Sequence, residues 1–123
     1  MSTAALIRLR AICLALPEAE ERHTWDHQTF RVRGKIFAMH VIGRDGTAGL
    51  WCKAPPGAQA ILLAADPQRF FRPPYVGPKG WIGVRLTSLA VSSKTGWDEV
   101  ADLVRRSWRM TAPKRLAATL QGA

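Results

Sequence analysis

PPYVGPKGW, residues 73–81, is the stretch of this 123-residue chain that decides its fold. Proline lacks the backbone donor that a helix or sheet needs, and glycine permits turn conformations. We therefore predict a shaped loop here rather than a regular element. Phe70-Phe71 precedes the loop and the alternating segment Ile82–Leu86 follows it, so residues 69–72 and 81–86 are expected to pair as two strands around it.

A second region, upstream of the loop, predicts a meander of antiparallel strands. Phe30 and Val32 alternate with Arg31 and Arg33, which is typical of a strand with one buried face. We expect a tight reversal at Gly34-Lys35. The strands predicted after it are residues 36–42, nearly all apolar and covered on both faces at least in part, and residues 48–53, joined by a turn at 43–46.

Helices are expected before and after these strands. An apolar stripe predicts a first helix from Ser2 or Thr3 to Leu16, ended by Pro17. Further helices are predicted over residues 58–64, from a capping Thr95 along an apolar face that ends at Trp108, and over residues 114–120. The acidic run at residues 18–21 is expected as a solvated loop, with a short strand or loop at 23–27. This order predicts an α+β domain, an antiparallel sheet with helices mainly on one face.

The loop and its surroundings resemble the MmcQ/YjbR family of small bacterial proteins. The resemblance is carried by residues 73–81 with their flanking strands, by the TFRVRGK segment at 29–35 and by APKRL at 112–116, and it extends from about Leu16 to Leu116. It implies a CyaY-like fold over a single domain, residues 1–123, and a double-wing motif proposed to bind DNA. Frataxin-like proteins share that fold and handle iron through an acidic first helix. Here the first helix carries Arg8 and Arg10 instead, so an iron-binding role is not expected.

Composition favours a soluble, basic, cytoplasmic protein. The net charge is +9, concentrated in residues 67–123, and such an excess attracts polyanions. No apolar run is long enough to cross a membrane and no signal peptide is recognisable. Cys13 and Cys52 are isolated in the sequence, so they are expected as buried, reduced core residues.

Catalytic and metal chemistry find little support in the sequence. His23 and His27 lie in a segment expected to be extended, and no further cysteine or histidine cluster accompanies them. No nucleophile elbow and no dinucleotide or phosphate-binding glycine motif occurs. We therefore expect no enzyme activity, no metal and no cofactor. The segment Gly77–Gly80 offers amides and one ammonium group that could hold a small anion, although a plain structural turn explains it as well.

Nucleic acid is the partner that the basic residues favour. The predicted contacts come from two basic hairpins and an aromatic loop: Arg31, Arg33, Lys35, Arg69, Arg72, Tyr75, Lys79, Trp81 and Arg85. They would bind phosphates with little base readout. Three alternatives stay open: the arginines form only the solvated face of a sheet, Trp81 is a core residue, or the charge meets an acidic protein.

Overall fold

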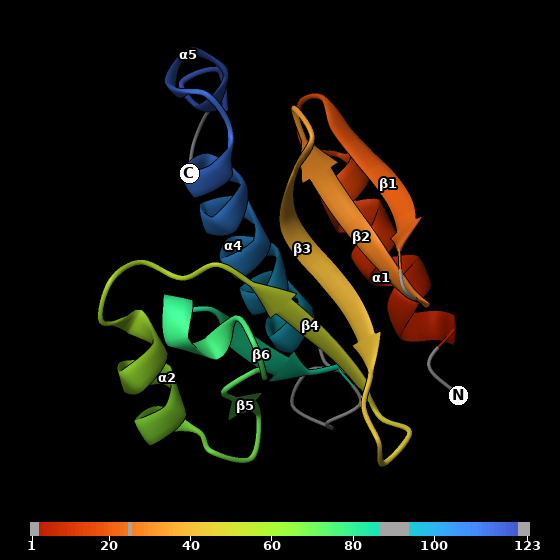
Figure 1. Ribbon diagram of the computed structural model, residues 1–123, viewed down its shortest axis with the longest axis vertical. Helices are drawn as coiled ribbons and strands as arrows, with labels where there is room; N and C mark the ends of the chain where they lie inside the picture. The colour runs from red at the N-terminus through yellow and green to blue at the C-terminus, as the bar shows by residue number, and fades with distance from the viewer. Residues whose placement is uncertain (1–2, 25, 87–93, 121–123) are drawn as a thin grey trace.

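The computed structural model describes residues 3–24, 26–86 and 94–120. Its centre is a six-stranded, fully antiparallel sheet in the order β1-β2-β3-β4-β6-β5 (Figure 1). The strands are β1 (Ala19–Thr24), β2 (His27–Val32), β3 (Lys35–Ile42), β4 (Ala48–Cys52), β5 (Phe70–Phe71) and β6 (Ile82–Arg85). The helices are α1 (Thr3–Leu14), α2 (Ala58–Ala65), the 3-10 turn η1 (Gly77–Lys79), α4 (Lys94–Thr111) and α5 (Lys114–Ala117).

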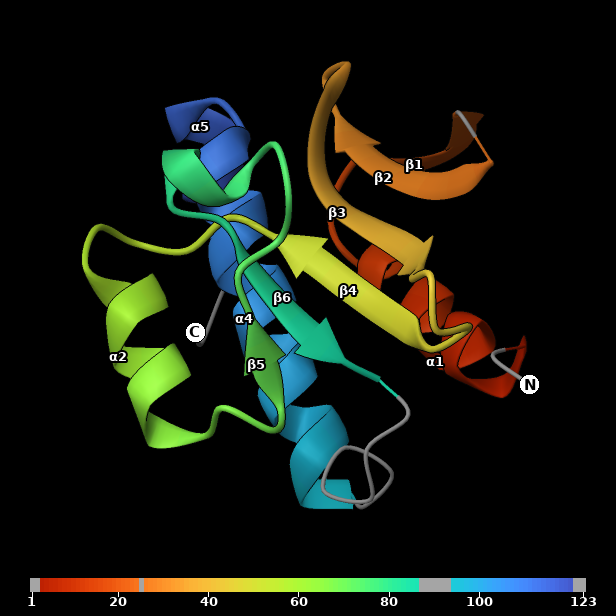
Figure 2. The same cartoon turned by 60° about the horizontal axis from the view of Figure 1, so that its bottom comes forward.

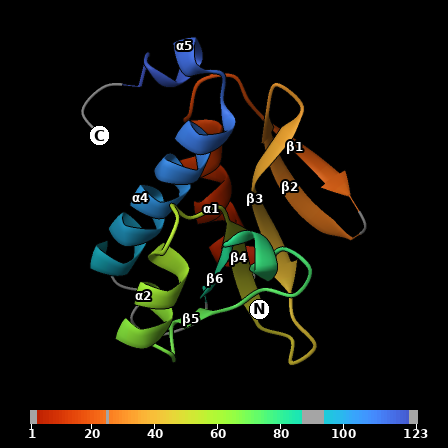
Figure 3. The same cartoon turned by 60° about the vertical axis from the view of Figure 1, so that its left-hand side comes forward.

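The two long helices lie on the same face of the sheet. α1 and α4 contact each other and both contact β3, and Figure 3 shows both helices on the same side of the sheet. The predicted apolar face of α4 is buried at four of its five positions, Ala101 being half-buried. Trp108 is fully buried and its indole N–H donates to the Pro17 carbonyl at 3.1 Å. The predicted α+β architecture is therefore confirmed.

Helix α1 ends at Leu14, two residues before the predicted end. Leu16 precedes Pro17, whose ring disfavours helical backbone in the residue before it. The Leu16 amide donates to the Cys13 carbonyl in a turn, at 3.2 Å, and the Leu16 side chain is still buried with Leu9 and Cys13. α4 begins at Lys94, so the predicted cap Thr95 is already inside the helix and that prediction was wrong. α1 begins at Thr3, and the alternative cap Ser2 lies outside the described residues.

Most of the acidic run at residues 18–21 belongs to a strand, so the prediction that it forms a loop was wrong. β1 begins at Ala19 and pairs with β2 at the edge of the sheet. Glu21 points to the helix side, where Arg10 of α1 donates to both of its carboxylate oxygens at 2.6 and 2.9 Å. Charged side chains are common on edge strands because they discourage pairing with other chains.

The turn between β2 and β3 is centred one residue earlier than predicted. Val32 pairs with Lys35, so the two turn residues are Arg33 and Gly34, with φ values of 51° and 80°. Positive φ at both central positions is the two-residue hairpin turn that matches strand twist. A register shift between Phe30 and Arg31 then lets Phe37 and Ala38 both reach the core.

The loop after β5 folds back across the open face of the sheet, opposite α1 and α4 (Figure 2). Gln59 of α2 fixes it by donating to the carbonyls of Gly77 at 2.9 Å and Trp81 at 2.6 Å. β5 and β6 pair antiparallel around this loop, as predicted. Among the residues that the structure describes, no helix is long and apolar enough to span a membrane.

Candidate functional site

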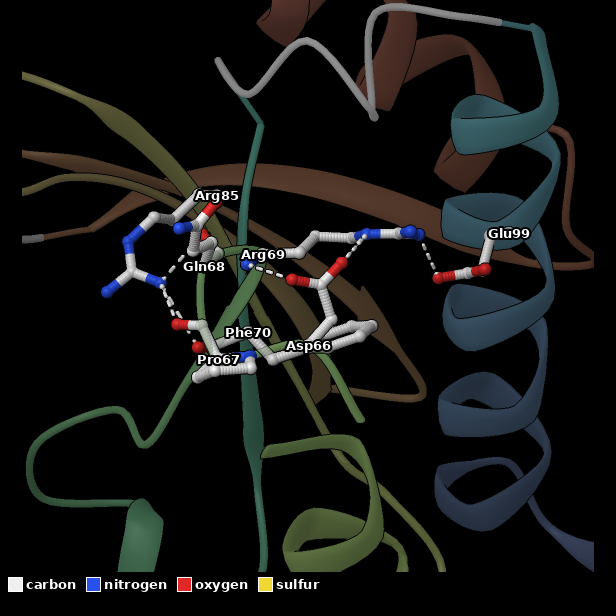
Figure 4. Close-up of polar contacts among 7 residues, drawn as sticks. All are labelled: Asp66, Pro67, Gln68, Arg69, Phe70, Arg85 and Glu99. Atoms are coloured by element: carbon white, nitrogen blue, oxygen red, sulfur yellow. Dashed lines mark hydrogen bonds and ion pairs between the residues drawn. The ribbon is translucent and has the colours of Figure 1, made fainter. Parts of the chain in front are cut away.

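Several of the arginines predicted to bind phosphate instead form ion pairs or hydrogen bonds with other residues of the protein. Arg69 is 20% exposed in its side chain and lies between Asp66, at 3.4 Å, and Glu99 of α4 (Figure 4). These ion pairs connect the start of β5 to the long helix. A guanidinium between two carboxylates is already neutralised, so Arg69 is a structural residue in this fold.

Arg85 is anchored to the backbone before β5. Its Nη1 donates to the carbonyls of Pro67, Gln68 and Phe70 at 3.1 to 3.3 Å (Figure 4). The guanidinium also stacks over the Phe71 ring, 5.1 Å from its centre. Among the described residues, Nε and Nη2 of Arg85 have no hydrogen-bond acceptor, so part of the group stays available to an anion.

Arg33 and Arg31 differ in how much of their charge is neutralised. Arg33 donates to both carboxylate oxygens of Glu18, at 2.6 and 3.1 Å, and this bond lowers the pKa of the Glu18 carboxyl. Arg31 donates instead to the hydroxyls of Thr29 and Thr24, at 3.2 and 3.1 Å. Within the described part of the chain no carboxylate lies in ion-pair range of Arg31, so its charge remains open to a partner.

Three lysines from separate elements are linked electrostatically, because the charges of two of them act on the third. Lys35 begins β3, Lys53 follows the last residue of β4, and Lys79 ends η1. Burial, and then the positive charges of Lys35 and Lys79, lower the pKa of the Lys53 ammonium. None of the three forms an ion pair with any described residue. We refer to these residues as the lysine cluster.

The lysine cluster joins the two hairpins that were predicted separately. Lys35 comes from the first and Lys79 from the second, and the charges of both act on Lys53, which sequence reasoning missed. Lys53 could have been found from its spacing, because Trp51 and Lys53 alternate with the buried Leu50 and Cys52. Period-two alternation assigns such a pair to the face opposite the core.

The aromatic residues of the decisive loop have opposite environments. Trp81 is only 9% exposed, which agrees with its reading as a core residue and leaves no free ring face for stacking. Tyr75 is 89% exposed. Arg72 is exposed and its side chain lies against Gly77, where an added Cβ would come within 2.7 Å of Arg72 Cγ.

A hollow of about 570 Å³ lies on the open face, beneath the loop. Three aromatic residues border it, Trp51, Phe71 and the largely exposed Tyr75, together with Arg44 and Arg85. Small residues make room for the Phe71 ring: a Cβ on Gly83 would meet this ring at 2.4 Å, and one on Gly49 would meet it at 3.3 Å. Trp51 and Arg44 were not predicted as site residues. The sequence feature that could have identified Trp51 is its alternation with Leu50 and Cys52, which places its side chain on the opposite face of the strand.

Thiol and metal chemistry have no visible site in the described residues. Burial raises the pKa of the Cys52 thiol to about 12 and raises that of Cys13 as well. Both cysteines are free and buried, as predicted. No three histidine, cysteine or carboxylate side chains of residues 3–24, 26–86 and 94–120 come together as a metal site. The described site therefore consists of cations and aromatic rings.

Comparison with known proteins identifies the family. Residues 14–110 match the family model YjbR. The fold is similar to the crystal structure of the Deinococcus radiodurans protein DR2400, which has a DUF419 domain, with a TM-score of 0.69 and 23% sequence identity. That similarity covers 85% of this chain and 76% of the other. No curated protein matches. The family model spans most of the chain, and the chain therefore belongs to the YjbR family.

Proposed function

We propose that this protein binds nucleic acid by holding phosphates at the lysine cluster, with Arg31 and Arg72 as flanking contacts. The observation that carries the proposal is that the partly buried Lys53 feels the positive charges of both Lys35 and Lys79, and that none of the three has a carboxylate partner among the described residues. Like charges repel one another, and a bound phosphate would relieve the repulsion that Lys35 and Lys79 exert on Lys53. A net charge of +9 adds a long-range attraction for polyanions.

Binding would be governed mainly by charge. Lysine presents a point charge and reads no base pattern by itself, so contacts of this kind favour no particular sequence. Releasing counterions from the nucleic acid makes the affinity fall steeply with salt. Arg33 and Arg69 are expected to contribute little to this, because each is held by carboxylates. We propose a binding role rather than catalysis, in the cytoplasm, where the buried thiols stay reduced.

A salt titration tests the proposal. Anisotropy of a labelled generic duplex should give a straight line of log affinity against log salt, with a slope near 0.9 for each phosphate neutralised. The Lys35→Gln/Lys79→Gln variant loses two phosphate contacts, so the magnitude of its slope should be smaller by about 1.8. The matched control is Arg106→Gln/Lys114→Gln, which removes the same charge from exposed positions on α4 and α5 and should reduce affinity much less.

Two results would overturn the proposal. One is a wild-type protein that binds no duplex and no single strand at low salt. The other is a folded Lys35→Gln/Lys79→Gln variant with the same slope as its control. In either case an acidic protein becomes the partner to test, since it could use the same positive charge without a nucleic-acid salt slope.

A further inference from the structure

The hollow lies next to the lysine cluster along a single strand. Gly49 and Trp51 line the hollow and alternate along β4, and Lys53 follows two residues later. At about 3.3 Å per residue, Gly49 and Lys53 are roughly 13 Å apart. Gly49 pairs with Arg85 on β6. Passing along the open side of the strand, a ligand therefore meets a cation, an aromatic ring and then Lys53.

Tyr75 borders the hollow, and its backbone is strained. Its φ is 66°, and the Val76 amide donates to the Pro74 carbonyl at 2.7 Å, across Tyr75. A hydrogen bond of this span around a positive φ is the rare, strained form of the γ-turn. A residue without a Cβ would adopt it more easily, yet this position holds a bulky ring that is almost fully exposed. Strain and exposure together are typical of residues that contact ligands.

The charges of the hollow favour an anion. Arg44 is exposed and has no ion-pair partner among the described residues, and Arg85 keeps two nitrogens free. Asp45 is the acidic residue of the lining, but Thr47 donates to it from its amide and its hydroxyl at 3.0 and 2.7 Å. Its carboxylate thus closes the β3–β4 turn. The hydrogen bonds from Thr47, and then the charge of Arg85, lower the pKa of the Asp45 carboxyl, so Asp45 offsets part of the Arg85 charge. With two guanidinium groups against one carboxylate, the hollow still has a net positive charge.

We propose that the hollow binds one nucleotide unit, with its flat base against Trp51 and Tyr75 and its phosphate at Arg44 and Arg85. The volume suits a small ligand, since such pockets commonly measure roughly 300–1,000 Å³. Aromatic rings stack on any base, and arginine matches phosphate geometry. The unit comes either from a free nucleotide or from an unpaired base of a single strand, and the second source rests on the function proposed above.

The two sources are separated by three probes: adenosine 5′-monophosphate, a short oligoadenylate strand and the same strand in a duplex. The variants are Tyr75→Ser and Arg44→Gln, both at exposed positions, with Arg106→Gln as the charge-matched control. Losing one stacked base commonly weakens binding by about fivefold or more. We expect a loss of that size for the monophosphate or the single strand in both variants, and no loss in the control.

Each outcome is decisive. If the monophosphate binds and the strand binds no better, the source is a free nucleotide. If the strand binds better than both the monophosphate and the duplex, the source is an unpaired base. If folded Tyr75→Ser and Arg44→Gln bind all three probes like the wild type, the inference is overturned, while the salt slope set by the lysine cluster would persist. If the protein binds the monophosphate but neither the strand nor the duplex, the proposed nucleic-acid binding is refuted and the nucleotide site in the hollow is supported.

Discussion

The ring of Phe71 lies directly on the backbone of Gly83, so closely that an added Cβ would come within 2.4 Å of it. Phe71 pairs with Gly83 across the β5–β6 ladder, and its ring also reaches Gly49 on the next strand. The guanidinium of Arg85 covers the same ring. One aromatic side chain therefore connects three strands and forms part of the hollow.

Replacing Gly83 with alanine should displace this ring. The methyl group has no room, so we expect a loss of about 1–3 kcal/mol in unfolding free energy, typical of overpacking, measured by urea denaturation. Gly49→Ala is the matched control, because its Cβ would lie 3.3 Å from the ring and needs only a small shift. Equal losses in the two variants would show that the ring does not occupy the space above Gly83.

Removing Glu18 should strengthen nucleic-acid binding. Glu18→Gln releases Arg33 from its two-bond ion pair, and the freed guanidinium lies in the turn before Lys35. We expect tighter binding and a salt slope larger by up to about 0.9. Asp98→Asn makes the same charge change at an exposed position of α4, so a gain no greater than that of Asp98→Asn would contradict this arrangement.

The fold could be predicted largely from local patterns. The alternation around Phe30 and the proline-glycine loop at 73–81 each identify an element within a few residues. The element boundaries that were predicted wrongly depend on finer effects. The turn at Arg33-Gly34 requires a non-glycine residue at positive φ, which is uncommon, and the acidic run becomes a strand only because β2 offers an edge to pair with.

The site could be predicted less well, because charge pairing is a long-range property. Arg33 meets Glu18 across 15 residues and Arg69 meets Glu99 across 30, and neither separation follows a helical or strand period. The sequence therefore predicts which side chains are cationic without predicting which of them are already neutralised. The action of the Lys79 charge on Lys53 similarly depends on the loop folding back over the sheet.

The two thiols should be inert in the native protein. Both are buried, and burial raises the pKa of Cys52 to about 12. Because the thiolate is the reactive form, neither cysteine should react with a maleimide or an aromatic disulfide at pH 8 until denaturant is added. Labelling of either residue at the rate of a free thiol, in folded protein, would show that the core around α1 and β4 is open.

The stability of the protein should fall as the pH decreases below about 6.5, because of His40. This side chain is only 6% exposed and its Nε2 has no hydrogen-bond partner in the described structure. Burial, and then the charges of Arg10 and His27, lower the pKa of His40 from its usual 6.5. The unfolded chain therefore binds this proton at a higher pH than the native protein does.

The sign of the effect follows from that difference. Between the ordinary histidine pKa and the lower native one, the unfolded state carries more protons, so the unfolding free energy decreases as the pH falls through this range. His40→Leu should lose this part of the dependence. His23→Gln, which removes an exposed histidine, should keep it. Urea unfolding from pH 7.5 to 5 measures all three proteins, and parallel curves for the wild type and His40→Leu would exclude His40 as the titrating group.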